Sequence, residues 1–232
     1  MGEMIDIPTL DASGAFSAYR ADPIGTPKAV VIVIQEIFGV NAGIRKKADD
    51  WATLGYLAVA PDMFWRLQPG VELDPDQPSE LKQAFELIGR FDIDAGMQDV
   101  KAVIRWSRAA VHDGKVGLVG FCFGGRIAYL AATRTDVDAS VGYYGGGIDK
   151  ALGEAHAIVK PLMLHFGGED THIPAAMVAA IADALAGKPD ASVHTYPGAG
   201  HGFATSFGQR RHDAAAREAD ARTEQLLARV LA

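Results

Sequence analysis

The chain has 232 residues, 49% of them hydrophobic, which is enough to bury a substantial core, and its formal net charge of −7 argues against a nucleic-acid partner, which favours a basic face. Its single cysteine, Cys122, excludes an internal disulfide and gives no sign of an oxidising compartment. The longest apolar stretch, 29–40, is too short to span a bilayer. We therefore expect a cytoplasmic protein that binds neither nucleic acid nor membrane.

The first half of the chain alternates apolar runs with segments of helical spacing. A continuous β-branched run over 28–39 is typical of a strand that is covered on both faces of a parallel sheet. Helical spacing follows over 41–56, and a second apolar run over 56–64 predicts another strand. Prolines and acids over 65–79 indicate a long surface loop. Two further helices are expected over 79–89 and 94–110.

The same alternation continues to the end of the chain. Strands are predicted over 115–121, 139–147, 160–170 and 191–201. Helices are predicted over 124–134, 174–187 and from about residue 211 onward. Strands that alternate with helices predict a mostly parallel sheet with helices on both faces. With no repeat or break in composition, we expect a single α/β domain over 1–232.

Polar side chains follow four of the predicted strands. They are Glu36, Cys122, Asp170 and His201. Because ligands bind beyond the carboxyl ends of the strands in open α/β sheets, this edge is where we expect the functional site.

Cys122 lies at the centre of the stretch Gly-Phe-Cys-Phe-Gly, 120–124. The stretch fits the G-x-nucleophile-x-G pattern, in which small residues allow a strand to turn sharply into a helix. Cysteine at a helix N-terminus is favoured as a thiolate. The alternative is a buried free cysteine that only fills space, since free cysteine is among the most buried residue types.

Asp170 and His201 each have a functional and a structural interpretation. A carboxylate at Asp170 can hold a histidine in one tautomer, or it can cap the helix that Pro174 opens. His201 lies between glycines after the last strand and can act as a general base, or it can be a surface residue of a flexible turn. The strongest rival is His172; the others are His165 and His194 inside strands and His212 at the start of the final helix.

The chain order favours the functional interpretation. Nucleophile, acid and histidine occur in the order that is typical of α/β-hydrolases, each after a predicted strand. We therefore predict a Cys122-His201-Asp170 triad. Oxyanion donors in this fold come from the N–H after the nucleophile and from a loop after an earlier strand, here Phe123 and Ile37.

Motifs along nearly the whole chain carry a family resemblance. They are QEIFG, APDMF, FDIDAGMQDV, VGFCFGGRIAY, GYYGGGI, HFGGEDTHIP, YPGAGHGF and RTEQLL. On these motifs the sequence resembles the dienelactone hydrolase family, also called carboxymethylenebutenolidases, of the α/β-hydrolase superfamily. The resemblance implies triad roles for Cys122, Asp170 and His201. It also implies that Glu36 pairs with the resting thiol and helps to deprotonate it when substrate arrives; otherwise Glu36 is a loop acid that caps the helix after Asn41.

The sequence departs from well-studied family members at the substrate end. Two arginines hold the carboxylate of the lactone in those members, and Leu81 and Thr205 stand at the matching positions here. Gly202 replaces a usual serine. The resemblance implies that Phe38, Phe85 and Tyr144 form the aromatic wall of the substrate pocket, as in the family. Substitute cations would have to come from Arg90, Arg210 or Arg211, which are otherwise exposed charges.

The expected activity is hydrolysis of a lactone or small ester through a covalent acyl-enzyme, with a small molecule as the partner and the protein as a monomer or weak homodimer. A cysteine-triad esterase or thiol peptidase on a neutral substrate is one alternative. Another is a redox sensor that uses Cys122 without turnover. A nucleotide-binding protein is disfavoured because GLVGFCFGG lacks the G-x-G-x-x-G spacing and the Walker lysine. We expect no cofactor and no metal, because the acids and histidines lack ligand spacing such as H-E-x-x-H.

Overall fold

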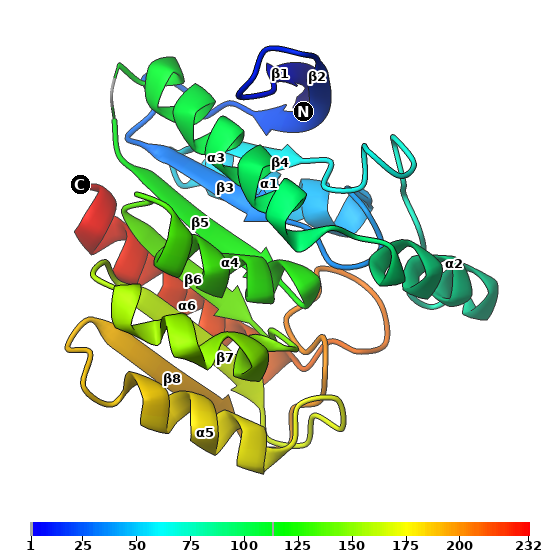
Figure 1. The fold of residues 1–232 in the computed structure, drawn as a ribbon, viewed down its shortest axis with the longest axis vertical. Helices are drawn as coiled ribbons and strands as arrows, with labels where there is room; N and C mark the ends of the chain where they lie inside the picture. Colours follow the sequence, from blue (N-terminus) through cyan, green and yellow to red (C-terminus); the bar gives the residue numbers. More distant parts are fainter. Residues whose placement is uncertain (1, 113) are drawn as a thin grey trace. The chain divides into compact units, whose positions relative to one another are not determined.

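The computed structural model describes residues 2–112 and 114–232. The chain divides into two compact units, Met1–Gly117 and Leu118–Ala232, and each is described by itself (Figure 1). The division falls inside strand β5, Val116–Phe121.

Within the described residues of the first unit, four complete strands have the sheet order β1-β2-β4-β3. They are β1 (Glu3–Pro8), β2 (Ala15–Ala21), β3 (Val30–Ile34) and β4 (Leu57–Pro61). The β1–β2 and β2–β4 pairs are antiparallel, whereas β3 and β4 are parallel. Every residue of β3 and β4 is buried, as expected for strands that are covered on both faces.

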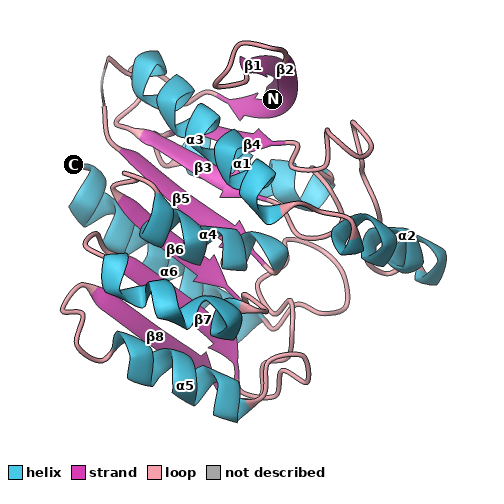
Figure 2. Cartoon of the chain, in the orientation of Figure 1, coloured by secondary structure: helices cyan, strands magenta, loops and turns pink. Residues whose placement is uncertain are grey.

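Three helices accompany these strands: α1 (Ala42–Thr53), α2 (Pro78–Gly89) and α3 (Ile93–Ala110). The side chain of Asn41 accepts hydrogen bonds from the first turn of α1, and Asp92 does the same for α3, which fixes where these helices begin. α1 and α3 pack against the strands, whereas α2 buries only Ala84 and Leu87. Loops join both ends of α2 to the rest of the unit (Figure 2).

The second unit has the strand order β5-β6-β7-β8, and β6, β7 and β8 are parallel. Its further elements are α4 (Phe123–Arg134), β6 (Ala139–Tyr143), the 3-10 helix η1 (Ile148–Ala157), β7 (Leu162–Gly167), α5 (Ala175–Leu185), β8 (Ala191–Tyr196) and α6 (Asp213–Leu231). α4 and α5 cover the near face of these strands in Figure 1, and α6 lies behind them. The arrowheads of β6, β7 and β8 point the same way, so the loops that leave them gather at one edge (Figure 2).

The predicted α/β class, with a mostly parallel sheet and helices on both faces, is confirmed. The sequence interpretation missed β1, β2 and η1. It also made five strands too long, those predicted over 28–39, 56–64, 139–147, 160–170 and 191–201. The first ends at Ile34 because the chain then turns through Gly39, whose φ of 77° and contact with Val71 O leave no room for a Cβ. The strand predicted over 139–147 ends at Tyr143 because Tyr144 adopts a φ of 39°. None of the helices in the described ranges is long and apolar enough to cross a membrane.

Candidate active site

Cys122 is the one residue between the end of β5 and the start of α4. Its backbone has φ 52° and ψ −112°, a strained conformation for a residue with a side chain. The flanking glycines allow this turn, because a Cβ on Gly120 would lie 1.9 Å from the carbonyl oxygen of Gly124. The backbone N–H of Cys122 donates to the carbonyl of Tyr143 on β6 at 2.9 Å. The strand-to-helix turn predicted from the GFCFG stretch is therefore present, with the sulfur at a helix N-terminus.

The imidazole of His201 lies between the sulfur of Cys122 and the carboxylate of Asp170. Its Nε2 is 3.2 Å from Cys122 Sγ, and its Nδ1 is 2.8 Å from Asp170 Oδ2. The side chain of His201 is 17% exposed, and that of Asp170 is fully buried. A histidine with Nδ1–H bound to a buried carboxylate presents Nε2 as the acceptor for the thiol proton.

Asp170 follows β7 and uses both of its carboxylate oxygens. Oδ1 accepts the backbone N–H groups of His172 at 2.8 Å and Ile173 at 3.2 Å, which leaves Oδ2 for His201. Asp170 does not cap α5, because the N-cap of that helix is Pro174. Its hydrogen bonds to the next residues instead close the turn that precedes the helix. These backbone donors fix the orientation of the carboxylate toward the histidine.

The two charged partners shift each other's pKa values in opposite directions. Burial acts to lower the pKa of His201, but hydrogen bonds to Asp170 and Cys122, together with their charges, raise it to about 10. Burial acts to raise the pKa of Asp170, but its hydrogen bond to His201, the charge of His201 and the two backbone donors hold it below the usual value. The surroundings therefore favour a protonated imidazole beside an ionised carboxylate.

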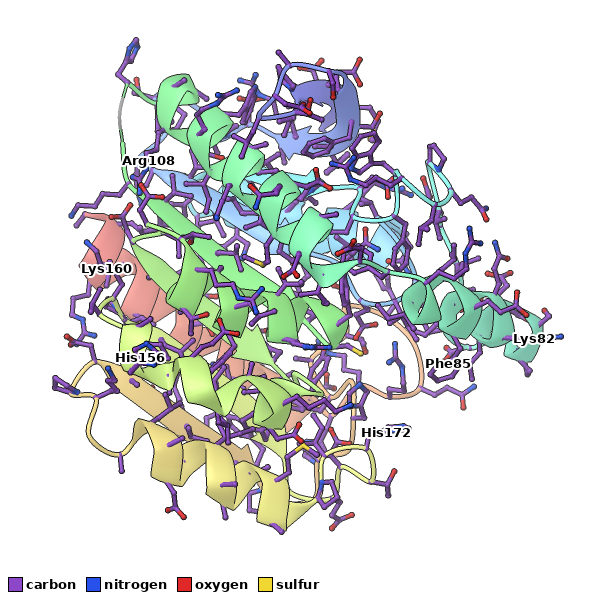
Figure 3. The ribbon with its side chains drawn as sticks, viewed as in Figure 1. Lys82, Phe85, Arg108, His156, Lys160 and His172 are labelled. Atoms are coloured by element: carbon purple, nitrogen blue, oxygen red, sulfur yellow. The ribbon has the colours of Figure 1, made fainter. Side chains whose placement is uncertain are left out.

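Two rings contact His201 from different elements. Tyr144, which is fully buried, meets it edge to face at 5.2 Å between ring centroids, and His172 does so at 5.0 Å. His172 is exposed and lies on the side of the second unit toward which β7 points (Figure 3). Tyr144 also packs on Phe203, which follows His201 in the same loop. The imidazole of His201 is thus held between a buried tyrosine and a surface histidine.

The other histidines considered from the sequence lie elsewhere. His165 and His194 stack on each other within β7 and β8, and His212 is the N-cap of α6, as the sequence predicted. Among the described histidines, His201 is the one whose ring reaches both Cys122 and Asp170.

Glu36, Ile37 and Phe38 belong to the first unit, in the loop that follows β3. All three are buried, with 6%, 8% and 4% exposure. The loop is held by Leu73, whose N–H donates to the carbonyl of Phe38 at 2.9 Å, and by the side chain of Gln35, which accepts the N–H of Met63 at 3.1 Å. The backbone that carries the predicted glutamate and oxyanion donor is thus fixed within its own unit.

Two further predicted pocket residues lie on α2 of the first unit. Leu81 is in its first turn and partly buried, and Phe85 is 55% exposed (Figure 3). Arg90, one of the candidate cations, is the C-cap of this helix.

The loop after His201 carries the remaining sequence candidates. Thr205 is partly buried, and its carbonyl accepts a hydrogen bond from Arg211. Gly202 has a φ of 76°, and a Cβ there would meet the guanidinium of Arg210 at 2.7 Å. The glycine at 202 therefore leaves the space into which Arg210, one of the candidate cations, packs.

In the part of the chain that the structure describes, no group of three or more His, Cys, Asp and Glu side chains is arranged to hold a metal ion. The arrangement that remains is a thiol, an imidazole and a carboxylate in line. Such a set can transfer an acyl group, since it combines a nucleophile, a base and a group that orients the base.

Known proteins are similar to this chain in both sequence and fold. The model of the dienelactone hydrolase family matches residues 16–231. Carboxymethylenebutenolidase from Pseudomonas putida is 40% identical over 203 residues, covering 87% of this chain and 86% of that protein. Carboxymethylenebutenolidase 1 from Cupriavidus pinatubonensis is 37% identical over 221 residues, covering 95% and 94%. The crystal structure of a dienelactone hydrolase homologue from Klebsiella pneumoniae has a TM-score of 0.82 at 29% identity and covers 97% of this chain and 99% of that one.

The strand order within each unit and the sharp turn at Cys122 are those of an α/β-hydrolase. The chain belongs to the dienelactone hydrolase family. It is a hydrolase that acts on ester or lactone bonds.

Proposed function

We propose that this protein opens a lactone or cleaves a small ester through a covalent acyl-enzyme on Cys122. The observation that supports this most directly is the alignment of three side chains. His201 lies 3.2 Å from the sulfur of Cys122 on one side and 2.8 Å from the carboxylate of Asp170 on the other. The curated relatives named for carboxymethylenebutenolidase activity point to the same bond type.

In the first half-reaction the sulfur attacks the carbonyl carbon, with its proton held by Nε2 of His201. The tetrahedral intermediate then collapses, the carbon–oxygen bond breaks, and the leaving alkoxide takes the proton from His201. This leaves a thioester on Cys122. In the second half-reaction His201 removes a proton from water and the hydroxide attacks the thioester carbonyl. The carbon–sulfur bond then breaks, the acid is released, and the departing thiolate of Cys122 regains the proton from His201. From a lactone the product is a single hydroxy acid.

The developing oxyanion would be bound by the backbone N–H groups of Phe123 and Ile37. Phe123 is the first residue of α4 and follows Cys122 directly, so its N–H belongs to the helix N-terminus. Ile37 lies in the fixed loop after β3. Donors of this kind stabilise the transition state by about 3 kcal/mol each.

Glu36 is assigned here to the activation of the thiol, through the pairing that the family resemblance implies. Its place in the loop after β3 supports the assignment, since Glu36 is buried there and hydrogen bonds of the neighbouring Gln35 and Phe38 hold the loop. Glu36→Gln should slow acylation and leave the stability of the first unit largely unchanged.

The pocket is assigned to Phe38, Phe85, Tyr144, Leu81 and Thr205. With an aliphatic side chain and a hydroxyl at the positions of the family's arginines, this set favours a neutral substrate over a carboxylated one.

We further infer that residues 1–232 act as one domain, in the cytoplasm, as a monomer or weak homodimer. A single cooperative unfolding transition and light scattering on a sizing column test the domain and the oligomeric state.

The test is a hydrolysis screen over short-chain esters and lactones with the wild type and Cys122→Ala. We expect kcat to fall by about 10³-fold or more in the variant, as for other nucleophile knock-outs. Ser140→Ala serves as the control, because it removes a buried hydroxyl of β6 that has no hydrogen-bond partner within the described residues. Full activity in Cys122→Ala contradicts the proposal.

A further inference from the structure

We propose that a buried hydrogen-bond chain between α6 and strands β6, β7 and β8 positions the nucleophile turn and the loop of the histidine. We call it the α6 network. Its members are Tyr143, His165, Tyr196, Asp220, Arg222 and Thr223. The proposal rests on the proposed function, because it assigns these side chains to the support of Cys122 and His201.

One half of the α6 network lies around Thr223. Its hydroxyl is 2.7 Å from the hydroxyl of Tyr143 and 3.1 Å from Nε2 of His165, and it donates to the carbonyl of Ala219. The hydroxyl of Tyr143 donates to Asp220 at 2.9 Å. Thr223 and His165 are 1% and 0% exposed, so their polar atoms form hydrogen bonds within the protein in place of hydrogen bonds to water.

The other half connects His165 to the surface of α6. Nδ1 of His165 lies 2.8 Å from the hydroxyl of Tyr196, and that hydroxyl accepts a hydrogen bond from Arg222 at 3.0 Å. Arg222 also forms an ion pair with Glu218 one turn earlier in the helix. The chain therefore begins at a cation on α6, passes through β8, β7 and β6, and returns to a carboxylate on α6.

Proton counting fixes the direction of these bonds. A hydroxyl has one proton to donate, and the carboxylate of Asp220 only accepts. Tyr143 therefore donates to Asp220, and the single proton of Thr223 goes to the carbonyl of Ala219 or to Tyr143, so Thr223 accepts from Nε2 of His165. Nδ1 of His165 then accepts from Tyr196. Each hydroxyl donates its one proton once, and His165 is neutral with its proton on Nε2.

The electrostatics agree with this assignment. Burial lowers the pKa of His165 well below its usual value, and the positive charges of His194 and Arg222 act in the same direction. Burial, and then the charge of Asp220, raises the pKa of Tyr143 well above its usual value. The titratable groups that face His165 are Tyr143 from β6, Tyr196 and His194 from β8 and Arg222 from α6. In this setting a neutral imidazole and neutral phenols are favoured.

Two backbone hydrogen bonds join the α6 network to the site. The carbonyl of Tyr143 accepts the N–H of Cys122 at 2.9 Å, and the carbonyl of His165 accepts the N–H of Tyr144 at 2.7 Å. Tyr144 in turn carries the ring that packs on His201. Because Cys122 and Tyr144 both have a positive φ, each needs its neighbours to hold it in place. Those neighbours are Tyr143 and His165, and the α6 network holds both of them in place.

Thr223→Val tests the proposal, because valine keeps the shape of threonine and removes its hydroxyl. We expect kcat to fall about tenfold with KM changed less than about threefold, the pattern of misplaced reacting groups rather than weaker binding. We also expect a shift in the pH midpoint of Cys122 alkylation by iodoacetamide, which reports on the single thiol of the chain without turnover. Thr223→Ser should restore both values, and Ser140→Ala should change neither.

Thr223→Val with wild-type kcat and an unchanged alkylation profile would overturn the proposal, even if its stability falls. If Thr223→Val does not fold, Tyr143→Phe decides by the same two measurements, since it removes a hydroxyl of the network and leaves the backbone. The ring ¹⁵N shifts of His165 provide a separate check: the Nε2–H tautomer supports the chain, and the Nδ1–H tautomer contradicts it. Activity in Cys122→Ala would refute the proposed function alone, because the alkylation midpoint in Thr223→Val does not depend on turnover.

Discussion

The imidazole rings of His172 and His201 lie 5.0 Å apart, edge to face, and it is His201 whose Nε2 lies 3.2 Å from the sulfur of Cys122. His172 supplies its backbone N–H to Asp170 instead. The two histidines thus have different relations to the same carboxylate, one through its ring and one through its backbone.

His201→Ala should therefore lower kcat by about 10²–10⁴-fold, the range for loss of a general base. His172→Ala keeps the backbone donor to Asp170 and should lower kcat by less than about tenfold. Steady-state kinetics on a chromogenic ester compares the two variants. The reverse ranking would assign the base to His172.

Gly125→Ala should destabilise the second unit. A Cβ there would lie 2.5 Å from the carbonyl of Tyr143 and 2.9 Å from Gly145 Cα, so α4 would have to move away from β6. Overpacking of this kind costs about 1–3 kcal/mol, which urea unfolding measures. Gly153→Ala in η1 is the matched control, because a Cβ there meets no atom within 4 Å. Equal stability of the two variants would show that this packing has no effect.

The charge of the substrate should matter little. Leu81 and Thr205 provide no cation, and the net charge of −7 gives no long-range attraction for an anion. We expect kcat/KM for a carboxylated lactone to stay within about tenfold of that for the matching amide, a difference of about 1.4 kcal/mol. A hundredfold or larger advantage for the acid would contradict this and implicate Arg210, which packs against Gly202 beside His201. Arg210→Gln would then remove the advantage.

Acid should unfold the protein partly through His165. Its folded pKa lies well below the unfolded value of 6.5, so the unfolded state binds one more proton below that pH. The stability it contributes is complete above about pH 6.5 and is lost as the pH falls below that value, by up to about 1.4 kcal/mol per pH unit. Urea midpoints between about pH 5 and 7 should depend on pH less steeply in His165→Gln than in the wild type. Equal slopes would mean that His165 is protonated in the folded state.

Much of the site could be predicted because its residues come at positions that topology determines. Asp170 and His201 follow the parallel strands β7 and β8, which end at one edge, and Cys122 follows β5, the neighbour of β6 in the sheet order. The GFCFG stretch indicated the turn, since a Cβ at Gly120 has no room there. The helices and central strands were predicted by their periodicity.

The α6 network could not be predicted in the same way. Asp220, Arg222 and Thr223 lie in an Ala-rich, highly charged helix whose pattern suggests a solvated face. Thr223 is nevertheless buried, because α6 packs on β6 and places its hydroxyl between Tyr143 and His165. Those contacts join residues that are 58 and 80 positions apart in the chain, and no local pattern encodes such a pairing. β1 and β2 were missed for a related reason: they alternate exposed and buried residues only weakly, and they are antiparallel.

The central claim is that acyl groups pass through the sulfur of Cys122, and mass spectrometry of an acid-quenched reaction tests it most directly. The wild type mixed with a short-chain chromogenic ester should gain the mass of one acyl group, and peptide mapping should locate it on Cys122. His201→Ala should accumulate little adduct, and Cys122→Ala should show none and no turnover. Rapid turnover with no adduct at Cys122, together with full activity in Cys122→Ala, would contradict the claim.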